Sequence, residues 1–192
     1  MPNHVTTRCT VSGPKLAVEA FKSALFTNAE IQFDFELIKP MPPILQRVIS
    51  PRRTGPNGRT MLEADENPRT FHGVEATEEE EAALRAIPFE SWYDWSVEHW
   101  GTKWGSYSVA VINDGAPFVF KFDTAWSFPV PIFEAMAERF PELTFDCLTF
   151  DEGWNFAGKG QFGASASTPF VIREATSDLY LAVYGEPPEA ED

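Results

Sequence analysis

The stretch Tyr107-Ser-Val-Ala-Val-Ile-Asn-Asp-Gly-Ala-Pro-Phe-Val-Phe-Lys-Phe122 decides the fold expected for this chain. Apolar side chains alternate with small or polar ones on both sides of Asn113-Asp-Gly115, and such a turn between two alternating runs is typical of a β-hairpin. A hairpin makes its two strands antiparallel. Outward from it, helical and strand-like segments interleave along the 192 residues. The chain is therefore expected to be an α+β protein with a mainly antiparallel sheet.

The first forty residues predict a strand, a helix and a second strand. Residues His4–Ser12 alternate, with Val and Cys on one face and Thr and Arg on the other, as in a half-buried strand. Pro14 then opens a helix at its first position, where a missing N–H is tolerated. Residues 31–39 alternate again, which predicts a second strand with its inward side chains at Phe33, Phe35 and Leu37.

Between residues 40 and 75 the periodic pattern is lost. Six of the 16 prolines lie between Pro40 and Pro68, so we expect a long irregular insertion here. Residues 77–80 then match a capping box, which predicts a short helix through about Ala86. We expect one domain over residues 1–185 that carries the insertion, followed by an acidic tail at residues 186–192.

The C-terminal half supplies the remaining elements. Residues 129–140 have the apolar stripe of a helix, and residues 143–150 and 154–162 alternate like paired strands. Residues 170–173 and 177–184 predict a last strand and a last helix. Together with the hairpin, these segments predict a ferredoxin-like split β-α-β fold with helices on one face of the sheet. No iron–sulfur cluster is expected, because two cysteines cannot supply four thiolate ligands.

The charge of the chain bears on its partners and its location. With 29 acidic and 15 basic residues the formal net charge is −14, which disfavours binding to nucleic acid. No apolar run is long enough for a membrane helix, and the N-terminus lacks the pattern of a signal peptide. Cys9 and Cys147 lie in strand-like runs and are expected to be buried thiols of a cytoplasmic protein. We expect no cofactor.

All six tryptophans lie between Trp92 and Trp154, and four of them lie in the segment Ser91–Trp104. On a helix that Ser91 and Asp94 could cap, this segment places large aromatic side chains on two stripes. The first interpretation is an architectural core helix that is buried on two sides and ends near Gly101. The second is that one stripe lines a groove. The candidate binding face is then formed by Trp95, His99, Trp100, Lys103, Trp104 and Trp126.

His99 is the histidine with the best case for a functional role, because it borders two tryptophans and follows Glu98. A histidine beside aromatic rings is more often a packed side chain with one hydrogen bond than a catalytic group. No catalytic residue is therefore assigned. The histidines and cysteines show no metal-ligand spacing, so no metal site is expected either.

The segment Gly153-Trp-Asn-Phe-Ala-Gly-Lys-Gly160 nearly matches the phosphate-binding loop G-x-x-x-x-G-K-[ST]. Gly160 stands where that loop needs a hydroxyl to hold magnesium, and aromatic residues fill the part that would wrap the phosphates. We therefore expect a glycine-rich hairpin here and no nucleotide site.

The insertion also concentrates basic residues. Residues 46–60 contain four arginines and no acidic residue, whereas residues 61–81 contain eight acidic residues and one arginine. Such a loop can bind a phosphate or an acidic protein surface, or it can simply balance the acidic residues that follow it. The candidate loop contacts are Arg47, Arg52, Arg53 and Arg59.

Four segments carry a family resemblance: Trp92-Tyr-Asp-Trp95, His99-Trp-Gly-Thr-Lys-Trp104, Thr124-Ala-Trp-Ser127 and Gly153-Trp-Asn-Phe-Ala-Gly158. In these segments the chain resembles the YubB-like proteins, which are encoded on bacterial plasmids and phage-related elements. The resemblance covers most of the chain but not residues 46–75. It implies a ferredoxin-like domain of unassigned function and a bacterial mobile-element origin, and it implies no reaction.

Three functions agree with these observations. The first is a non-enzymatic interaction protein of a mobile element, whose acidic surface binds a host or element-encoded protein and counters host defence, as anti-CRISPR or anti-restriction proteins do. The second is a small enzyme or ligand-binding domain with a pocket lined by Trp and His. The third is a nucleic-acid binder through the arginine-rich loop.

Overall fold

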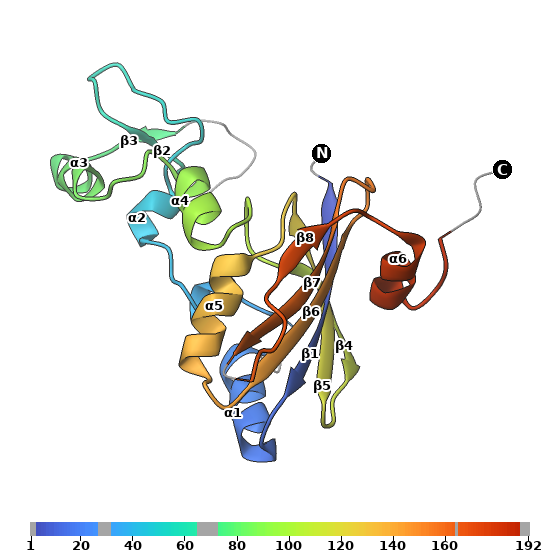
Figure 1. Cartoon of the computed structure of the whole chain (residues 1–192). Coiled ribbons are helices and arrows are strands. Elements are labelled where there is room, and N and C mark those ends of the chain that lie inside the picture. Colours follow the sequence, from blue (N-terminus) through green and yellow to red (C-terminus); the bar gives the residue numbers. More distant parts are fainter. Residues whose placement is uncertain (1–2, 27–31, 65–72, 164, 189–192) are drawn as a thin grey trace.

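The computed structural model describes residues 3–26, 32–64, 73–163 and 165–188. Its main feature is a six-stranded antiparallel sheet in the order β4-β5-β1-β6-β7-β8 (Figure 1). The strands are β1 (His4–Ser12), β4 (Tyr107–Asn113), β5 (Phe118–Ala125), β6 (Thr144–Asp151), β7 (Ala157–Gly163) and β8 (Val171–Arg173). The predicted hairpin is confirmed as β4 and β5.

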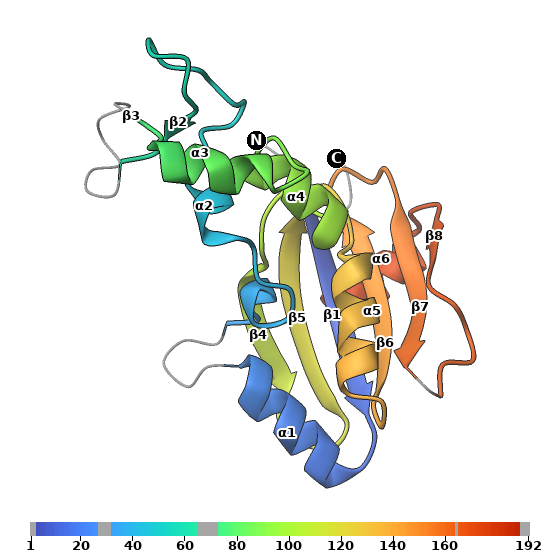
Figure 2. The same cartoon turned by 90° about the vertical axis from the view of Figure 1, so that its left-hand side faces the viewer.

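Four of these strands and two helices form the predicted ferredoxin-like core. β1 lies between β5 and β6 and is antiparallel to both, and β5 separates it from β4. Helices α1 (Lys15–Leu25) and α5 (Val130–Arg139) pack side by side on one face of the sheet (Figure 2). This order confirms the split β-α-β arrangement, because β1 and β4 run in the same direction with one antiparallel strand between them.

A smaller packed layer covers part of the other face. Helix α6 (Ser177–Tyr184) lies against β6 and β1, opposite α1 and α5 (Figure 1). The buried centre of this layer is formed by Phe150, Ala157 and Val183. α1 and α5 are thus the helices that share one face, as predicted, and α6 is an addition on the other face.

The second strand predicted for residues 31–39 is wrong. The described part of this segment contains the short 3₁₀ helix η1 (Phe35–Leu37), and the Asp34 carboxylate caps it by accepting a backbone N–H at 2.9 Å. Phe33 is buried as predicted, but Leu37 is 42% exposed. A side chain that hydrogen-bonds its own backbone competes with sheet pairing, so the alternation identified a buried residue but not a strand.

The segment between α1 and β4 is longer than the predicted insertion and has short elements of its own. They are α2 (Pro43–Gln46), the two-stranded sheet of β2 (Met61–Leu62) and β3 (Val74–Glu75), α3 (Glu78–Arg85) and α4 (Trp92–His99). The predicted capping box of α3 is confirmed, with Thr77 and Glu80 exchanging side-chain to backbone hydrogen bonds. These elements lie beyond one end of the main sheet (Figure 2), and their buried Leu45, Val48, Leu62, Ala76 and Leu84 continue its core.

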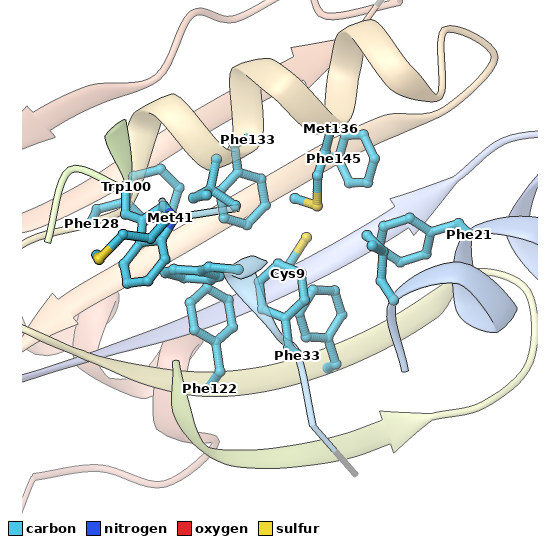
Figure 3. Close-up of a cluster of buried hydrophobic side chains, with 14 of the residues drawn as sticks. Cys9, Phe21, Phe33, Met41, Trp100, Phe122, Phe128, Phe133, Met136 and Phe145 are labelled. Carbon is cyan, nitrogen blue, oxygen red and sulfur yellow. The ribbon is translucent and has the colours of Figure 1, made fainter. Parts of the chain in front are cut away.

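Phenylalanines dominate the core between the sheet and helices α1 and α5 (Figure 3). The Phe33 ring lies 5.2 Å from that of Phe120 and 5.1 Å from that of Phe122, both edge to face. Cys9 and Cys147 face each other across β1 and β6 with their sulfurs 3.8 Å apart, and both are confirmed as buried free thiols. Burial raises the pKa of the Cys147 thiol, which therefore stays neutral in the core.

An acidic tail is predicted at residues 186–192. Of these, residues 189–192 lie outside the described residues. Among the helices of the described ranges, none has the length and apolar character needed to cross a bilayer.

Candidate functional site

Helix α4 is shorter than the tryptophan-rich segment from which it was predicted. It begins after Ser91, whose hydroxyl donates to the Asp94 carboxylate at 2.9 Å, and it ends at His99. Gly101 then adopts φ +76°, and a Cβ at this position would meet Pro131 of α5 at 2.7 Å. The glycine thus lets the chain leave the helix beside α5, which confirms the predicted end and places Trp104 outside the helix.

Two of the predicted binding residues are core residues. Trp95 and Trp100 are buried, with their rings perpendicular and 5.3 Å apart. The Trp100 indole N–H donates to the carbonyl of Lys39 at 2.9 Å, so its polar atom is also satisfied. Both side chains join the insertion to the main core, in agreement with the first of the two interpretations.

His99 is packed between two aromatic side chains. Its ring stacks on Trp95 at 4.3 Å and meets the Phe89 ring edge to face at 5.0 Å. Its Nδ1 lies 3.2 Å from the Trp95 carbonyl oxygen, one helical turn earlier. This is the setting of a packed histidine with one hydrogen bond. Within the described ranges, no three His, Cys, Asp or Glu side chains are grouped to hold a metal ion.

A partly exposed cluster, which we call the aromatic surface, consists of Tyr93 and the three remaining predicted residues: Lys103, Trp104 and Trp126. The Lys103 ammonium lies 4.8 Å from the centre of the Trp104 ring and 4.6 Å from that of Trp126. Tyr93 of α4 meets Trp126 edge to face at 6.5 Å. Trp126 is 45% exposed. The aromatic surface therefore offers ring faces and one cation to the solvent.

Hydrogen bonds between two loops hold the aromatic surface in place. The Thr102 hydroxyl donates to the Ala125 carbonyl at 3.1 Å, and the Ser127 hydroxyl donates to the Gly101 carbonyl at 2.6 Å. The backbone N–H of Trp126 donates to the Asn3 carbonyl at 3.0 Å. The loop after α4 and the loop after β5 are thus tied to each other and to the start of β1.

The structure therefore divides the six predicted residues into two groups. Trp95, His99 and Trp100 pack into the core, whereas Lys103, Trp104 and Trp126 lie on the surface with Tyr93. Residue spacing could not separate the groups, because Trp104 lies beyond the end of the helix and Trp126 comes from a different loop. Among the described residues, no ring contact joins Trp126 to His99.

The arginine-rich loop is paired with the acidic residues that follow it. Arg47 lies 2.7 Å from Glu80, and Arg59 lies 3.0 Å from Glu78. Arg52 donates to the Thr60 hydroxyl at 2.6 Å and lies 3.9 Å from Glu81. Only Arg53 of the four candidate loop contacts is exposed to solvent without an ion pair to another described residue. The positive charges of the loop thus pair with the glutamates of α3. This agrees with the interpretation in which the loop balances the acidic residues that follow it.

These carboxylates predict a pH dependence of stability. Hydrogen bonds from the hydroxyl and then the backbone N–H of Thr60, aided by Arg52, hold the pKa of Glu81 below its ordinary value, against a smaller effect of burial. A pKa lowered by folding stabilises the protein above the unfolded-state pKa, and this stabilisation is lost as the pH falls through the folded-state pKa. We expect Glu81→Gln to lower the urea midpoint at pH 7 and to lower it less as the pH falls toward 3. An equal loss at both pH values would contradict this assignment.

The near match to a phosphate-binding loop is a turn and a strand, as predicted. Residues 157–163 form β7, and the preceding turn is held by Asp151, which accepts the backbone N–H of Asn155 at 3.1 Å. A side chain at Gly160 would collide with the backbone of Phe170, so this glycine serves close packing of two chain segments.

Sequence reasoning missed a polar cluster beside α6, on the face of the sheet opposite α1 and α5, which we call the open sheet face. His4 Nδ1 lies 2.7 Å from the Tyr107 hydroxyl, and the Thr6 hydroxyl donates to Asp123 at 2.7 Å. Burial, then Asp123 and Glu152, raise the pKa of Tyr107 to about 12, so Tyr107 stays protonated. The sequence indicated only that Thr6 lies on the polar face of the first strand. The register that places Asp123 opposite Thr6 is a property of the tertiary structure.

Comparison with known proteins agrees with this fold. Searches among curated proteins and among solved structures found no match. One protein-family model matches residues 99–184, which extend from the end of α4 to the end of α6. This part of the chain is similar to the family described as "Ferredoxin-like domain in Api92-like protein", which supports a ferredoxin-like domain with no activity attached to it.

Proposed function

We propose that this protein is a non-enzymatic interaction protein that binds a partner protein through the aromatic surface. The observation that carries the proposal is Trp126, a large apolar side chain that is 45% exposed and that its backbone holds at φ +71°. Exposed Trp and Tyr side chains on a rigid support are the residues that contribute most to protein–protein affinity.

The backbone of Trp126 is strained without a matching gain in burial. A bulky residue with a positive φ costs about 1–3 kcal/mol, and such strain is typical of functional sites. Trp154 also has a positive φ, +58°, and is 43% exposed, but it stacks on Tyr180 at 5.6 Å and meets Phe150 at 4.9 Å. Packing against two rings therefore accounts for Trp154, whereas Trp126 meets one ring among the described residues, that of Tyr93 at 6.5 Å.

The charge around the aromatic surface favours a basic partner. On α4, next to Tyr93, the side chains of Asp94, Val97 and Glu98 are exposed, and the whole chain carries a net charge of −14. A partner's Lys or Arg can contact the carboxylates and the ring faces together, as Lys103 already does with two tryptophans. Binding should therefore weaken as the salt concentration rises.

The biological setting of the proposal rests on the resemblance to the YubB-like proteins. On that basis the partner is a protein of a bacterial host or of the mobile element itself, met in the cytoplasm, and a host-defence protein of the CRISPR or restriction type is the sharpest candidate. The supporting features are the acidic composition and the four tryptophan-containing segments.

Replacing Trp126 with Gly is expected to weaken partner binding strongly while preserving the fold. Glycine adopts a positive φ without strain, which offsets its entropic cost, so the thermal midpoint should change little. Loss of a central aromatic contact should weaken binding by about 30-fold or more. A partner captured from bacterial lysate at low salt would be purified, and its affinity for both proteins would be measured across salt concentrations.

Trp154→Gly is the matched control, because it also replaces an exposed tryptophan with positive φ. It removes the contacts with Tyr180 and Phe150, so it should lower the thermal midpoint and leave the partner affinity unchanged. Equal binding by the wild type and Trp126→Gly would overturn the proposal, as would the absence of any salt-sensitive partner.

A further inference from the structure

Two cationic side chains stand directly opposite each other on the open sheet face. Arg8 of β1 and Lys121 of β5 are register partners, so both point to the same side of the sheet. This is the side on which Thr6 meets Asp123 and on which α6 packs. Like charges at directly opposed positions destabilise a sheet. A chain with 29 acidic residues thus places two positive charges where they repel each other.

The two neighbouring aspartates keep their negative charge but form no ion pair with these cations. Asp123 accepts the Thr6 hydroxyl at 2.7 Å, and Asp146 accepts the side-chain amide of Gln161 at 2.8 Å. Across the described ranges, neither Arg8 nor Lys121 forms an ion pair. On this face the six strands carry four basic side chains against two acidic ones, whereas the chain as a whole has 15 against 29; the four are Arg8, Lys121, Lys159 and Arg173.

An aromatic side chain and a hydroxyl border the two cations. The Lys121 ammonium lies 5.3 Å from the centre of the Tyr184 ring, and the Tyr184 hydroxyl donates to Thr6 at 3.2 Å. Tyr184 of α6 therefore flanks one side of the pair. Thr10 follows Arg8 on the same face of β1, because side chains two residues apart in a strand point the same way.

We propose that Arg8 and Lys121 bind a phosphate dianion, either free or as the terminal phosphate of a larger ligand. Two positive charges that form no ion pair suit a group of charge near −2, which a phosphate monoester carries at neutral pH and a phosphodiester does not. The planar guanidinium of Arg8 binds two phosphate oxygens, the Lys121 ammonium contributes a mobile point charge, and the Thr10 hydroxyl can donate. This site is separate from the aromatic surface and does not depend on the proposed function.

Inorganic phosphate is the first probe. Thermal unfolding would be measured in phosphate and in chloride at equal ionic strength, with the wild type, Arg8→Gln and Arg8→Lys. At a phosphate concentration ten times the Kd, the wild-type midpoint should rise by roughly 3–6 °C. Arg8→Lys should keep part of this rise and Arg8→Gln should lose it. In chloride, Arg8→Gln should melt at or above the wild-type temperature, because one of two repelling charges is gone.

Lys15→Gln is the control, since Lys15 is an exposed cation at the start of α1, outside the sheet, and its removal changes the net charge equally. It should keep the wild-type response to phosphate. Retention of the phosphate-dependent rise by Arg8→Gln would overturn the proposal, and so would an equal rise in chloride.

A second measurement distinguishes the two sources of the phosphate. A short single-stranded oligonucleotide would be titrated with and without a 5′-phosphate. Binding of the 5′-phosphorylated form alone supports a terminal monoester on a larger ligand, and a response to inorganic phosphate alone supports a small free anion. Equal binding of both oligonucleotides without any response to inorganic phosphate contradicts the proposed site.

Discussion

Replacing Phe33 with Ala is expected to destabilise the protein by about 3–5 kcal/mol, because it removes a buried ring and leaves a cavity that the core cannot fill. Phe33 is 1% exposed, and its ring contacts those of Phe26, Phe35, Phe120 and Phe122 at 5.1–5.8 Å. In a protein of this size such a loss lowers the thermal midpoint by roughly 6–20 °C. Thermal and urea unfolding of the purified variant would measure it.

Leu37→Ala is the matched control for Phe33→Ala. The same alternating pattern predicts both side chains to face inward, but Leu37 is 42% exposed at the end of η1. Its truncation should change the free energy of unfolding by less than about 0.5 kcal/mol. Comparable losses at the two positions would mean that residues 32–39 pair as the strand that the alternation predicts, contrary to the structure.

Gly160→Ser is expected to destabilise the protein strongly although it completes the sequence of a phosphate-binding loop. A Cβ at this position would lie 2.2 Å from the Phe170 Cα and 2.5 Å from the Pro169 carbonyl oxygen. Both obstacles are backbone atoms, so β7 or the segment before β8 must move, which costs about 1–3 kcal/mol or more. The thermal midpoint should fall by roughly 2–12 °C.

Gly105→Ser controls for the change of residue type, because a Cβ at Gly105 meets no atom within 4 Å. Its midpoint should stay close to that of the wild type. Neither variant should bind ATP with magnesium in calorimetry, since residues 157–163 form a strand and not the loop that wraps phosphates. Nucleotide binding by Gly160→Ser, or wild-type stability of this variant, would contradict the structural assignment of this segment.

Local patterns predicted most elements because short-range physics determines them. The Asn-Asp-Gly turn identified the hairpin, the capping box identified α3, and the glycine after α4 ended that helix where it was expected to end. The failure at residues 32–39 has a similar origin, since alternation reports which side chains are buried and does not distinguish a strand from a capped turn.

The candidate site could be predicted only in part. The tryptophan-rich segment pointed to the right region, but Trp100 became a core residue through its hydrogen bond to Lys39, 61 residues earlier in the chain. Trp126 became part of the aromatic surface because a loop 22 residues beyond Trp104 meets Tyr93 in the first turn of α4. Residue spacing contains no information about either contact, so the sequence alone could not separate the two interpretations of that segment.

The sequence by itself determined an antiparallel α+β fold, the positions of its main helices and strands, and the acidic charge of the protein, because these follow from periodicity, turn residues and composition. Only the tertiary structure decided that α6 covers the opposite face, that the loop arginines are paired with α3, and that Arg8 faces Lys121. The physical reason is strand register and loop closure. They bring together residues that are between 19 positions (Arg59 and Glu78) and 113 positions (Arg8 and Lys121) apart. A shift of one residue would turn Arg8 to the other face of the sheet.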